Sequence, residues 1–251
     1  MATDKSLKSV SRQNIRKILL IISFLLIPVT IFYVSPIVIM MGAAEGIASG
    51  SMLLFILLFI LSLFVGRLWC GWLCPMGAWQ EICSPLMKHT VIGGWRDWIK
   101  YGVTVLWLGV IGLSMFSAGG IHAVDPFYGT VGGISISSLE VLMMVALIFF
   151  IIFIVAFFTG RRGFCHVLCP IAGIIVAGRL IRNLAGWPAL QLNAAANQCI
   201  DCNKCKNECP MGLDVHRMVR AGNMEDPDCI LCANCSDTCP KGVIRYSVAR
   251  K

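Results

Sequence analysis

Residues 199–210 have the sequence CIDCNKCKNECP, and residues 229–240 repeat the same cysteine pattern as CILCANCSDTCP. Each segment follows C-x2-C-x2-C-x3-C-P. Three thiolates spaced in this way can bind one face of an iron–sulfur cubane within a single tight loop. The fourth cysteine, next to a proline, is carried away from that loop and is placed to complete the other cluster of a pair. The repeated pattern therefore predicts two [4Fe–4S] clusters.

The spacing also predicts which cysteines share a cluster. The first ligand set is Cys199, Cys202, Cys205 and Cys239, and the second is Cys229, Cys232, Cys235 and Cys209. Structural zinc and disulfides are the alternatives, but zinc sites usually combine two C-x2–4-C pairs, and disulfides are disfavoured inside the cell. Because residues 188–251 include few large apolar side chains, bound metal must supply much of their folding free energy. We expect a small α+β ferredoxin-like domain there, of the bacterial two-cluster type.

The rest of the chain has the composition of a membrane protein. Hydrophobic residues make up 57% of the sequence and charged residues 14%, against roughly 45–50% and about 25% in soluble domains. Long apolar segments occupy residues 18–41, 47–65, 101–116 and 141–158. A bilayer core about 30 Å thick needs about 20 helical residues. We therefore predict an α-helical membrane domain over residues 18–187, with four transmembrane helices arranged as two hairpins.

The basic residues predict the orientation of these helices. The loops 42–46 and 117–140 contain no lysine or arginine. All 21 lysine and arginine residues of the chain lie in the N-terminal arm, the central loop and the C-terminal part. The positive-inside rule then places both termini and the clusters on the cytoplasmic side of the inner membrane, with residues 1–17 as a cytoplasmic basic arm. The net charge of +8 is thus a topology signal, and no nucleic-acid partner is expected. The first apolar segment is too long for a signal peptide and is expected to remain as an anchor.

One further apolar segment, residues 171–184, is too short to cross a bilayer. It contains Arg179 and Arg182 among apolar residues. We expect an amphipathic helix on the inner membrane surface, with both arginines reaching toward lipid headgroups.

A second cysteine motif, C-x3-C-P, occurs twice in the helical part. Its cysteines are Cys70 and Cys74, and then Cys165 and Cys169, 95 residues further on. This predicts an internal duplication of a helical hairpin that ends in the motif. Four roles remain open for these cysteines: a four-thiolate site for a further cluster or another metal, redox-active thiols, part of a quinone site, or helix packing. The remaining cysteine, Cys83, has no partner pattern and is expected to be structural.

A quinol-oxidising site would also need proton acceptors. His122 and Asp125 in an outer loop and His166 inside the second C-x3-C motif are candidates. Loop capping and solvation are the commoner roles for such residues.

With both motif sets present, the chain resembles the NapH-type membrane ferredoxins, in a wider group with NosR-type and CcoG-type proteins. The resemblance covers nearly the whole chain. It implies the membrane subunit of a quinol dehydrogenase that transfers electrons from the quinone pool, through [4Fe–4S] clusters, to a NapG-like iron–sulfur partner and a terminal reductase. Unlike NosR-type proteins, the chain has no flavin-bearing domain. Two alternatives are a CcoG-like copper reductase or assembly factor, and a membrane anchor for a soluble reductase.

Overall fold

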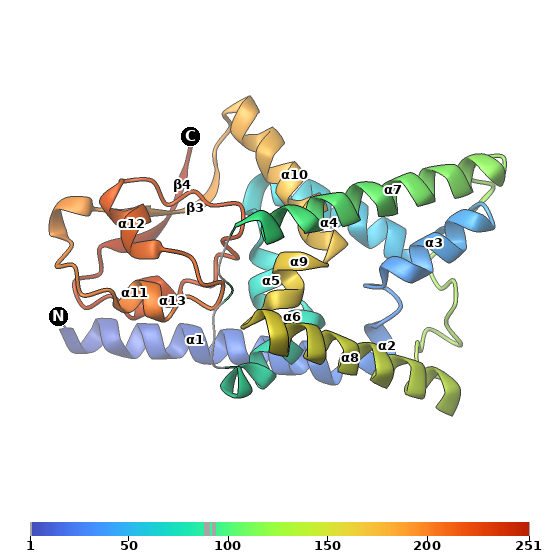
Figure 1. Ribbon diagram of the computed structural model, residues 1–251, viewed down its shortest axis with the longest axis horizontal. Coiled ribbons are helices and arrows are strands. Elements are labelled where there is room, and N and C mark those ends of the chain that lie inside the picture. Colours follow the sequence, from blue (N-terminus) through green and yellow to red (C-terminus); the bar gives the residue numbers. More distant parts are fainter. Residues whose placement is uncertain (1, 88–90, 92–93, 251) are drawn as a thin grey trace.

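The computed structural model describes residues 2–87, 91 and 94–250. The molecule is elongated, with a cysteine-rich domain at one end and long helices at the other, and both termini lie at the cysteine-rich end (Figure 1). Three short helices lie between these parts: α5 (Leu68–Trp72), α6 (Pro75–Cys83) and α9 (Gly163–Val167).

The first apolar segment does not form one transmembrane helix, so this part of the prediction is wrong. Helix α1 (Ala2–Leu25) ends within it and is followed by the short α2 (Ile27–Thr30) and by α3 (Pro36–Ala44). Pro28 and Pro36 lie in the first turns of α2 and α3. Proline lacks a backbone N–H and clashes with the preceding turn, so it begins a helix more readily than it continues one.

Two helices of the described part are long and apolar enough to cross a membrane, α7 (Ile99–Ser117) and α8 (Leu139–Thr159). Helix α4 (Gly50–Val65) is apolar but has only 16 residues, which span about 24 Å against a hydrocarbon core of about 30 Å. The outward faces of α7 and α8 carry exposed apolar side chains, and Phe116 is 86% exposed. The structure thus contains two candidate spans where the sequence predicts four.

The two C-x3-C-P motifs occupy equivalent places in two similar helical units. In each unit a long helix ends at a glycine with positive φ, Gly66 after α4 or Gly160 after α8. A five-residue helix follows, α5 or α9, and then a Cys-Pro pair begins the next helix, α6 or α10 (Pro170–Ala185). The predicted repeat is therefore visible in the backbone as helix, short helix and helix.

Helix α10 does not have the position expected for the segment 171–184. Gly173 and Gly178 allow it to pack closely between α7 and α4, since a Cβ atom on them would lie 2.1 Å from Thr104 Oγ1 and 1.9 Å from Ser62 Oγ. Its arginines are buried and do not reach outward: both pair with one carboxylate of the cysteine-rich domain, as described below. The expectation that they reach lipid headgroups is wrong, because a protein carboxylate satisfies them.

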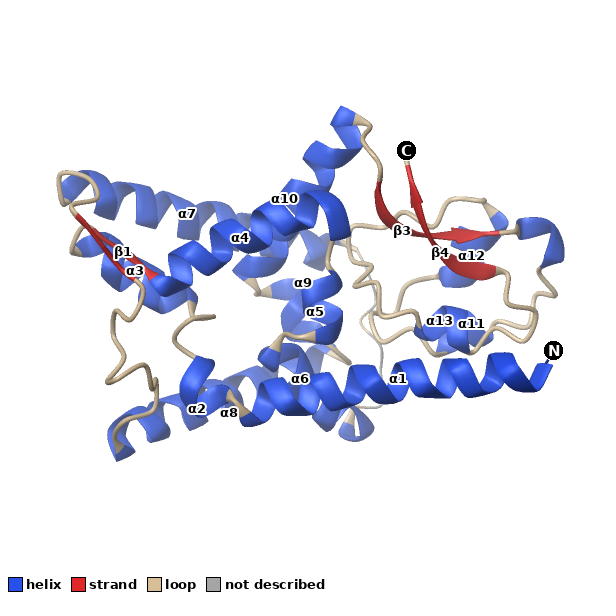
Figure 2. Ribbon diagram, turned by 180° about the vertical axis from the view of Figure 1, so that it is seen from behind, coloured by secondary structure: helices blue, strands red, loops and turns tan. Residues whose placement is uncertain are grey.

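At the end far from the cysteine-rich domain, two outer loops are joined by a short parallel sheet (Figure 2). Strand β1 (Ile47–Ser49) pairs with β2 (Ala123–Asp125), with Ile47 opposite Ala123. The backbone N–H of His122 also donates to Gly46 O at 2.8 Å. The sheet therefore ties the start of α4 to the loop that follows α7.

The cysteine-rich domain has the α+β composition predicted for it. Strand β3 (Ala189–Ala194) pairs antiparallel with β4 (Ile244–Ala249). The connecting chain contains three short helices, α11 (Lys204–Asn207), α12 (Val215–Arg220) and α13 (Asn234–Asp237). Single 3-10 turns lie at Ser84–Leu86, Trp95–Trp98 and Ala196–Gln198.

Helix α1 packs along both parts of the molecule. Arg12 forms an ion pair with Asp237, and Gln13 Nε2 donates to Cys232 O at 3.0 Å. One turn further, Arg16 Nη2 donates to Glu81 Oε1 at 2.5 Å. The N-terminal arm is therefore a helix that contacts the cysteine-rich domain and the helical part together.

Glu81 binds two buried arginines, because Arg162 Nη2 also donates to its Oε2 at 2.7 Å. Burial by itself would raise the pKa of Glu81, but the charges of Arg162 and Arg16 outweigh burial and lower that pKa to about 2. This carboxylate joins α1, α6 and the connection between α8 and α9.

We predict that Glu81→Gln lowers the free energy of unfolding by about 3–5 kcal/mol, because two buried guanidinium groups lose their shared counter-charge. Thermal unfolding of the detergent-solubilised protein measures the loss. The exposed Glu140→Gln is the matched control and should cost no more than about 1 kcal/mol.

The pKa of Glu81 is lower in the folded chain than its ordinary 4.5. Its stabilising effect is therefore complete above about pH 4.5 and is lost as the pH falls toward about 2. Equal unfolding temperatures for both variants at neutral pH would contradict the prediction.

Candidate iron–sulfur centres

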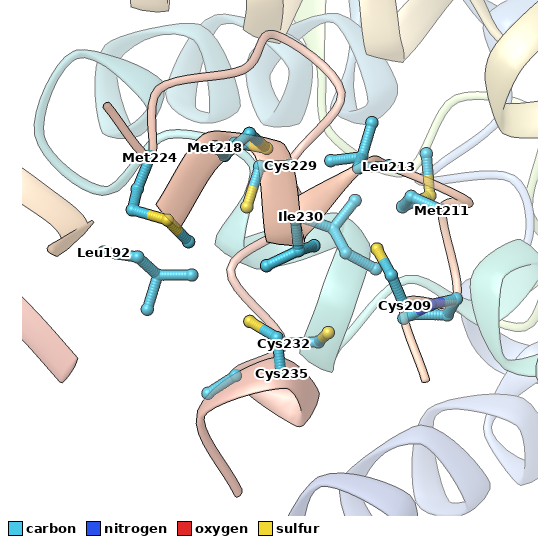
Figure 3. Close-up of a pocket in the computed structure, with 13 residues that line it drawn as sticks. Leu192, Cys209, Met211, Leu213, Met218, Met224, Cys229, Ile230, Cys232 and Cys235 are labelled. Atoms are coloured by element: carbon cyan, nitrogen blue, oxygen red, sulfur yellow. The ribbon is translucent and has the colours of Figure 1, made fainter. Parts of the chain in front are cut away.

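The eight ferredoxin-type cysteines line two separate cavities of similar size. One cavity has about 350 Å³ of empty volume and is lined by Cys199, Cys202, Cys205 and Cys239. The other has about 390 Å³ and is lined by Cys209, Cys229, Cys232 and Cys235 (Figure 3). We call them the first and the second cavity. Each combines three cysteines of one motif with the fourth of the other, which is the grouping that the spacing predicts; as cluster ligands, these residues stay a prediction.

The loops around both cavities share an unusual backbone conformation. In the first motif Asp201 and Asn203 have φ of 54° and 56°, and in the second Leu231 and Ala233 have φ of 50° and 58°. Residues other than glycine rarely adopt this conformation, which costs of order 1–3 kcal/mol each. Both loops therefore hold the same strained shape on either side of their middle cysteine. We expect metal–thiolate bonds to compensate for this strain.

Backbone N–H groups point at several of these sulfur atoms. The N–H of Lys206 lies near Cys205, that of Asn234 near Cys232 and that of Leu231 near Cys229. Such donors stabilise a thiolate and bound sulfide. The loops therefore supply hydrogen bonds that an anionic cluster requires.

The two cavities differ in their surroundings. The second is lined by apolar side chains, among them Met211, Leu213 and Ile230. In the first, Cys202 is exposed and Lys241 belongs to the wall. Cluster potentials depend on burial and nearby charge, so two clusters held here would differ in potential.

Burial also affects the free thiols of the second cavity. It raises the pKa of the Cys209 thiol to about 12 and that of Cys229 to about 11. These groups are therefore protonated at neutral pH unless a metal replaces the protons. Loading of this cavity should release protons.

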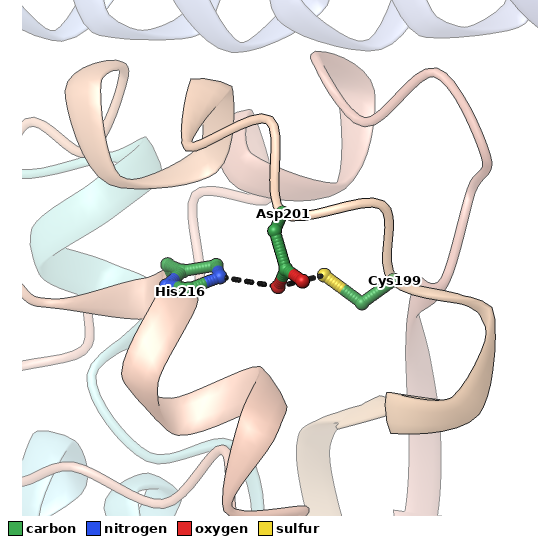
Figure 4. A group of neighbouring side chains, drawn as sticks. All are labelled: Cys199, Asp201 and His216. Carbon is green, nitrogen blue, oxygen red and sulfur yellow. Dashed lines mark hydrogen bonds and ion pairs between the residues drawn. The ribbon is translucent and has the colours of Figure 1, made fainter.

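Beside the first cavity, three side chains form a hydrogen-bonded group (Figure 4). His216 Nε2 lies 2.7 Å from Asp201 Oδ1, and the Cys199 thiol donates to the same oxygen at 3.7 Å. A cluster-bound Cys199 would be a thiolate and could no longer donate. The pair of Asp201 and His216 would then lie next to an anionic ligand.

A buried ionic network joins the cysteine-rich domain to the helical part. Asp228, next to Cys229, accepts from Arg67 Nη1 at 2.6 Å and from Lys100 Nζ at 2.5 Å. Arg67 and Lys100 are 0% exposed. Sequence reasoning missed this network, since a lone aspartate and two distant cations form no motif.

A second carboxylate of the domain binds the arginines of α10. Glu225 Oε1 accepts from Arg179 Nε at 2.7 Å and from Arg182 Nη2 at 2.9 Å. Burial would raise the pKa of Glu225, but the two arginines and Asn183 lower it to about 2. The domain is thus held by two carboxylates, each bonded to two cations of the helical part.

Of the three proton-acceptor candidates, only His166 lies near the cysteine cavities. Its Nε2 is 3.0 Å from Met211 O, and its Nδ1 is 3.1 Å from Asp97 Oδ1. Both ring nitrogens therefore lie within hydrogen-bond distance of an oxygen atom. His122 and Asp125 lie in the outer loop, where His122 Nε2 contacts Ala118 O and Asp125 accepts from Phe127 N–H. These contacts are those of loop capping.

All four cysteines of the C-x3-C-P motifs are buried between the long helices and the second cavity. Helix α5, which contains Cys70, packs tightly against the cysteine-rich domain. A Cβ atom on Gly71 would lie 2.4 Å from Ile230 O, and Trp72 Nε1 donates to Leu231 O at 3.1 Å. Cys83 packs instead with Met87 and Ala156 in an apolar cluster.

Comparisons with known proteins agree with the cysteine pattern. Residues 198–244 match a family model described as a 4Fe-4S dicluster domain. Residues 49–91 and 141–188 match a second model, described as a 4Fe-4S binding domain. The chain carries 4Fe-4S binding domains in both of its parts.

Several known proteins are similar to this chain at low identity. The chain is 25% identical over 194 residues to the putative electron transport protein YccM of Escherichia coli, which is 73% of this chain and 52% of that protein. It is 29% identical to the regulatory protein NosR of Stutzerimonas stutzeri over 56% of this chain and 19% of that protein. It is 25% identical to protein RdxA of Cereibacter sphaeroides over 63% of this chain and 38% of that protein. The chain is thus distantly homologous to proteins of which it spans about half the length or less. No solved structure matches it.

We predict that pairs of cysteine variants will reveal the exchange of fourth ligands between the motifs. In Cys199→Ser/Cys239→Ser both changes fall in the first cavity, so one cluster and about four iron atoms should be lost. In Cys199→Ser/Cys209→Ser the changes fall in both cavities, and about eight should be lost. Iron and acid-labile sulfide assays on anoxically purified protein measure the difference. The reverse order of losses would show that each motif binds its own cluster.

Proposed function

We propose that this protein is a membrane-bound electron-transfer subunit that passes electrons between the quinone pool and an iron–sulfur partner protein. The observation that carries the proposal is the order of the two cysteine-lined cavities. The second adjoins the helical part through Ile230 and Met211, and the first includes the exposed Cys202. Clusters in these cavities would form a path from the helices to the surface. The name of the Escherichia coli relative, a putative electron transport protein, agrees with this role.

A location in the cytoplasmic membrane is supported by exposed apolar side chains on α4, α7 and α8. The lysine-free loops lie at one end of the molecule, whereas the N-terminal arm and the C-terminal domain lie at the other. We propose a multi-pass arrangement with the cysteine-rich domain in the cytoplasm, in keeping with the positive-inside rule.

Quinol as the electron donor is supported by two adjoining cavities. One is apolar, has about 1070 Å³ of empty volume, and lies between α4, α7 and α10. The other is polar and is lined by Asp97, His166 and Asp228 together with Met211, which also lines the second cavity. Tyr101 belongs to the walls of both. An isoprenoid tail suits the apolar cavity, and a quinol headgroup suits the polar one beside the second cavity.

The exposed first cavity is the proposed exit to a soluble partner, a NapG-like iron–sulfur protein if the resemblance to NapH-type proteins extends to partners. Because Cys202 is exposed, a cluster there would lie near the surface. Electron transfer to a docked protein requires such proximity.

We predict that a short-chain quinol reduces the clusters of the full chain in lipid nanodiscs, and that Ala177→Trp slows this reduction. Ala177 lines the apolar cavity, and overfilling such a site costs about 1–3 kcal/mol, equivalent to about 5- to 160-fold weaker quinol binding. Anaerobic stopped-flow absorbance measures the rate. Ala146→Trp, in a different apolar groove against α8, is the matched control and should leave the rate unchanged. Clusters that dithionite reduces and quinol does not would refute the quinol-linked function.

A further inference from the structure

Four buried cysteines of the helical part belong to neither cavity described above. We infer that Cys70, Cys74, Cys165 and Cys169 bind a third iron–sulfur cluster, of the [4Fe–4S] type, at the centre of the duplicated helical units. This site is additional to the two-cluster path of the proposed function and does not depend on quinol as the donor.

The two units present their cysteines in the same way. Cys74 and Cys169 both precede a proline and begin a helix, with φ/ψ of −71°/120° and −74°/111°. The N–H groups of Met76 and Gly77 point at Cys74, and that of Ala172 points at Cys169. Each of these sulfur atoms therefore lies at a helix N-terminus, where N–H groups favour a thiolate.

Buried hydrogen-bond donors without acceptors lie near three of the four cysteines. Arg67 is fully buried and interacts electrostatically with Cys70, Cys165 and Cys169, yet its Nε and Nη2 have no acceptor among the described residues. Nε of the buried Arg162, another neighbour of Cys165, also lacks one there. Unpaired buried donors cost about 1–3 kcal/mol each. The sulfide and thiolate groups of a cluster would supply the missing acceptors.

Two buried arginines give the surroundings of these cysteines a positive charge. Arg67 and Arg162 both lie next to them. Neither has a carboxylate to itself, because Arg67 shares Asp228 with Lys100 and Arg162 shares Glu81 with Arg16. A [4Fe–4S]2+ cluster bound by four thiolates carries about two negative charges. The charge of the pocket thus complements that of a cluster.

The sulfur atoms are too far apart for a single tetrahedral metal ion. A tetrahedral zinc ion with Zn–S bonds of about 2.3 Å requires sulfur atoms about 3.8 Å apart. In the described part of the chain, groups of three or more ligand atoms within 4.8 Å of one another include none of these four cysteines. A cubane binds each thiolate to a different iron and so accepts wider spacing. The family model for a 4Fe-4S binding domain also matches both units and none of the eight ferredoxin-type cysteines.

Iron analysis of the full chain, purified without oxygen in detergent, tests this inference. We expect about twelve iron atoms and twelve acid-labile sulfides per chain, against about eight for two clusters. Cys70→Ser/Cys169→Ser, with one change in each unit, should lose about four iron atoms and keep the EPR signals of the other two clusters. Cys83→Ser, a buried cysteine outside the site, is the matched control and should keep all twelve.

A second variant keeps the thiols and so guards against a folding defect in the double mutant. Gln80 Nε2 donates to Cys165 Sγ at 3.2 Å. Gln80→Leu should retain the iron count and lower the midpoint potential of one centre only, because it removes an N–H···S bond that stabilises the reduced form.

A count of about eight iron atoms in the wild-type protein, or stoichiometric zinc or copper retained by the four cysteines, would overturn the inference. Either result would leave quinol-dependent reduction of the other clusters intact, so the two proposals can fail separately.

Discussion

The structure depends on buried carboxylates that each bind two buried cations. Glu81 does this within the helical part, and Asp228 and Glu225 do so between that part and the cysteine-rich domain. A buried charge without a partner costs several kcal/mol, so these contacts restrict how the two parts can be arranged. They bring the loop of residues 226–235 against α5. The orientation of the cysteine cavities follows from them.

This orientation gives the two cavities different environments. The second cavity adjoins the helices and is lined by apolar side chains, whereas the first includes the exposed Cys202. Low dielectric and few charges disfavour the added electron of a reduced cluster, and solvent favours it. Burial would therefore separate the potentials of two otherwise similar clusters held in these cavities.

The sequence was sufficient to predict the α+β domain, the grouping of its cysteines into two sets and the repeat in the helical part, because each depends on exact spacing. It was not sufficient for the first apolar segment, where Pro28 and Pro36 divide the helix despite continuous hydrophobicity. Arg179 and Arg182 were placed at headgroups because their partner, Glu225, is more than 40 residues away. Local patterns predict local structure, but a counter-ion from a distant segment has no signature in them.

The two internal repeats of the chain meet at the second cavity. Helix α5 of the first helical unit contacts Ile230 and Leu231 in the second cysteine motif. Helix α9 of the second unit contacts Met211, just after the first motif, through His166. Since Ile230 and Met211 both line the second cavity, that cavity lies above the two short helices that contain the first cysteine of each C-x3-C-P motif. A duplicated helical unit and a duplicated cysteine motif thus share one contact region. Metal-binding sites on either side of it would lie next to each other, which is the arrangement that transfer of single electrons requires.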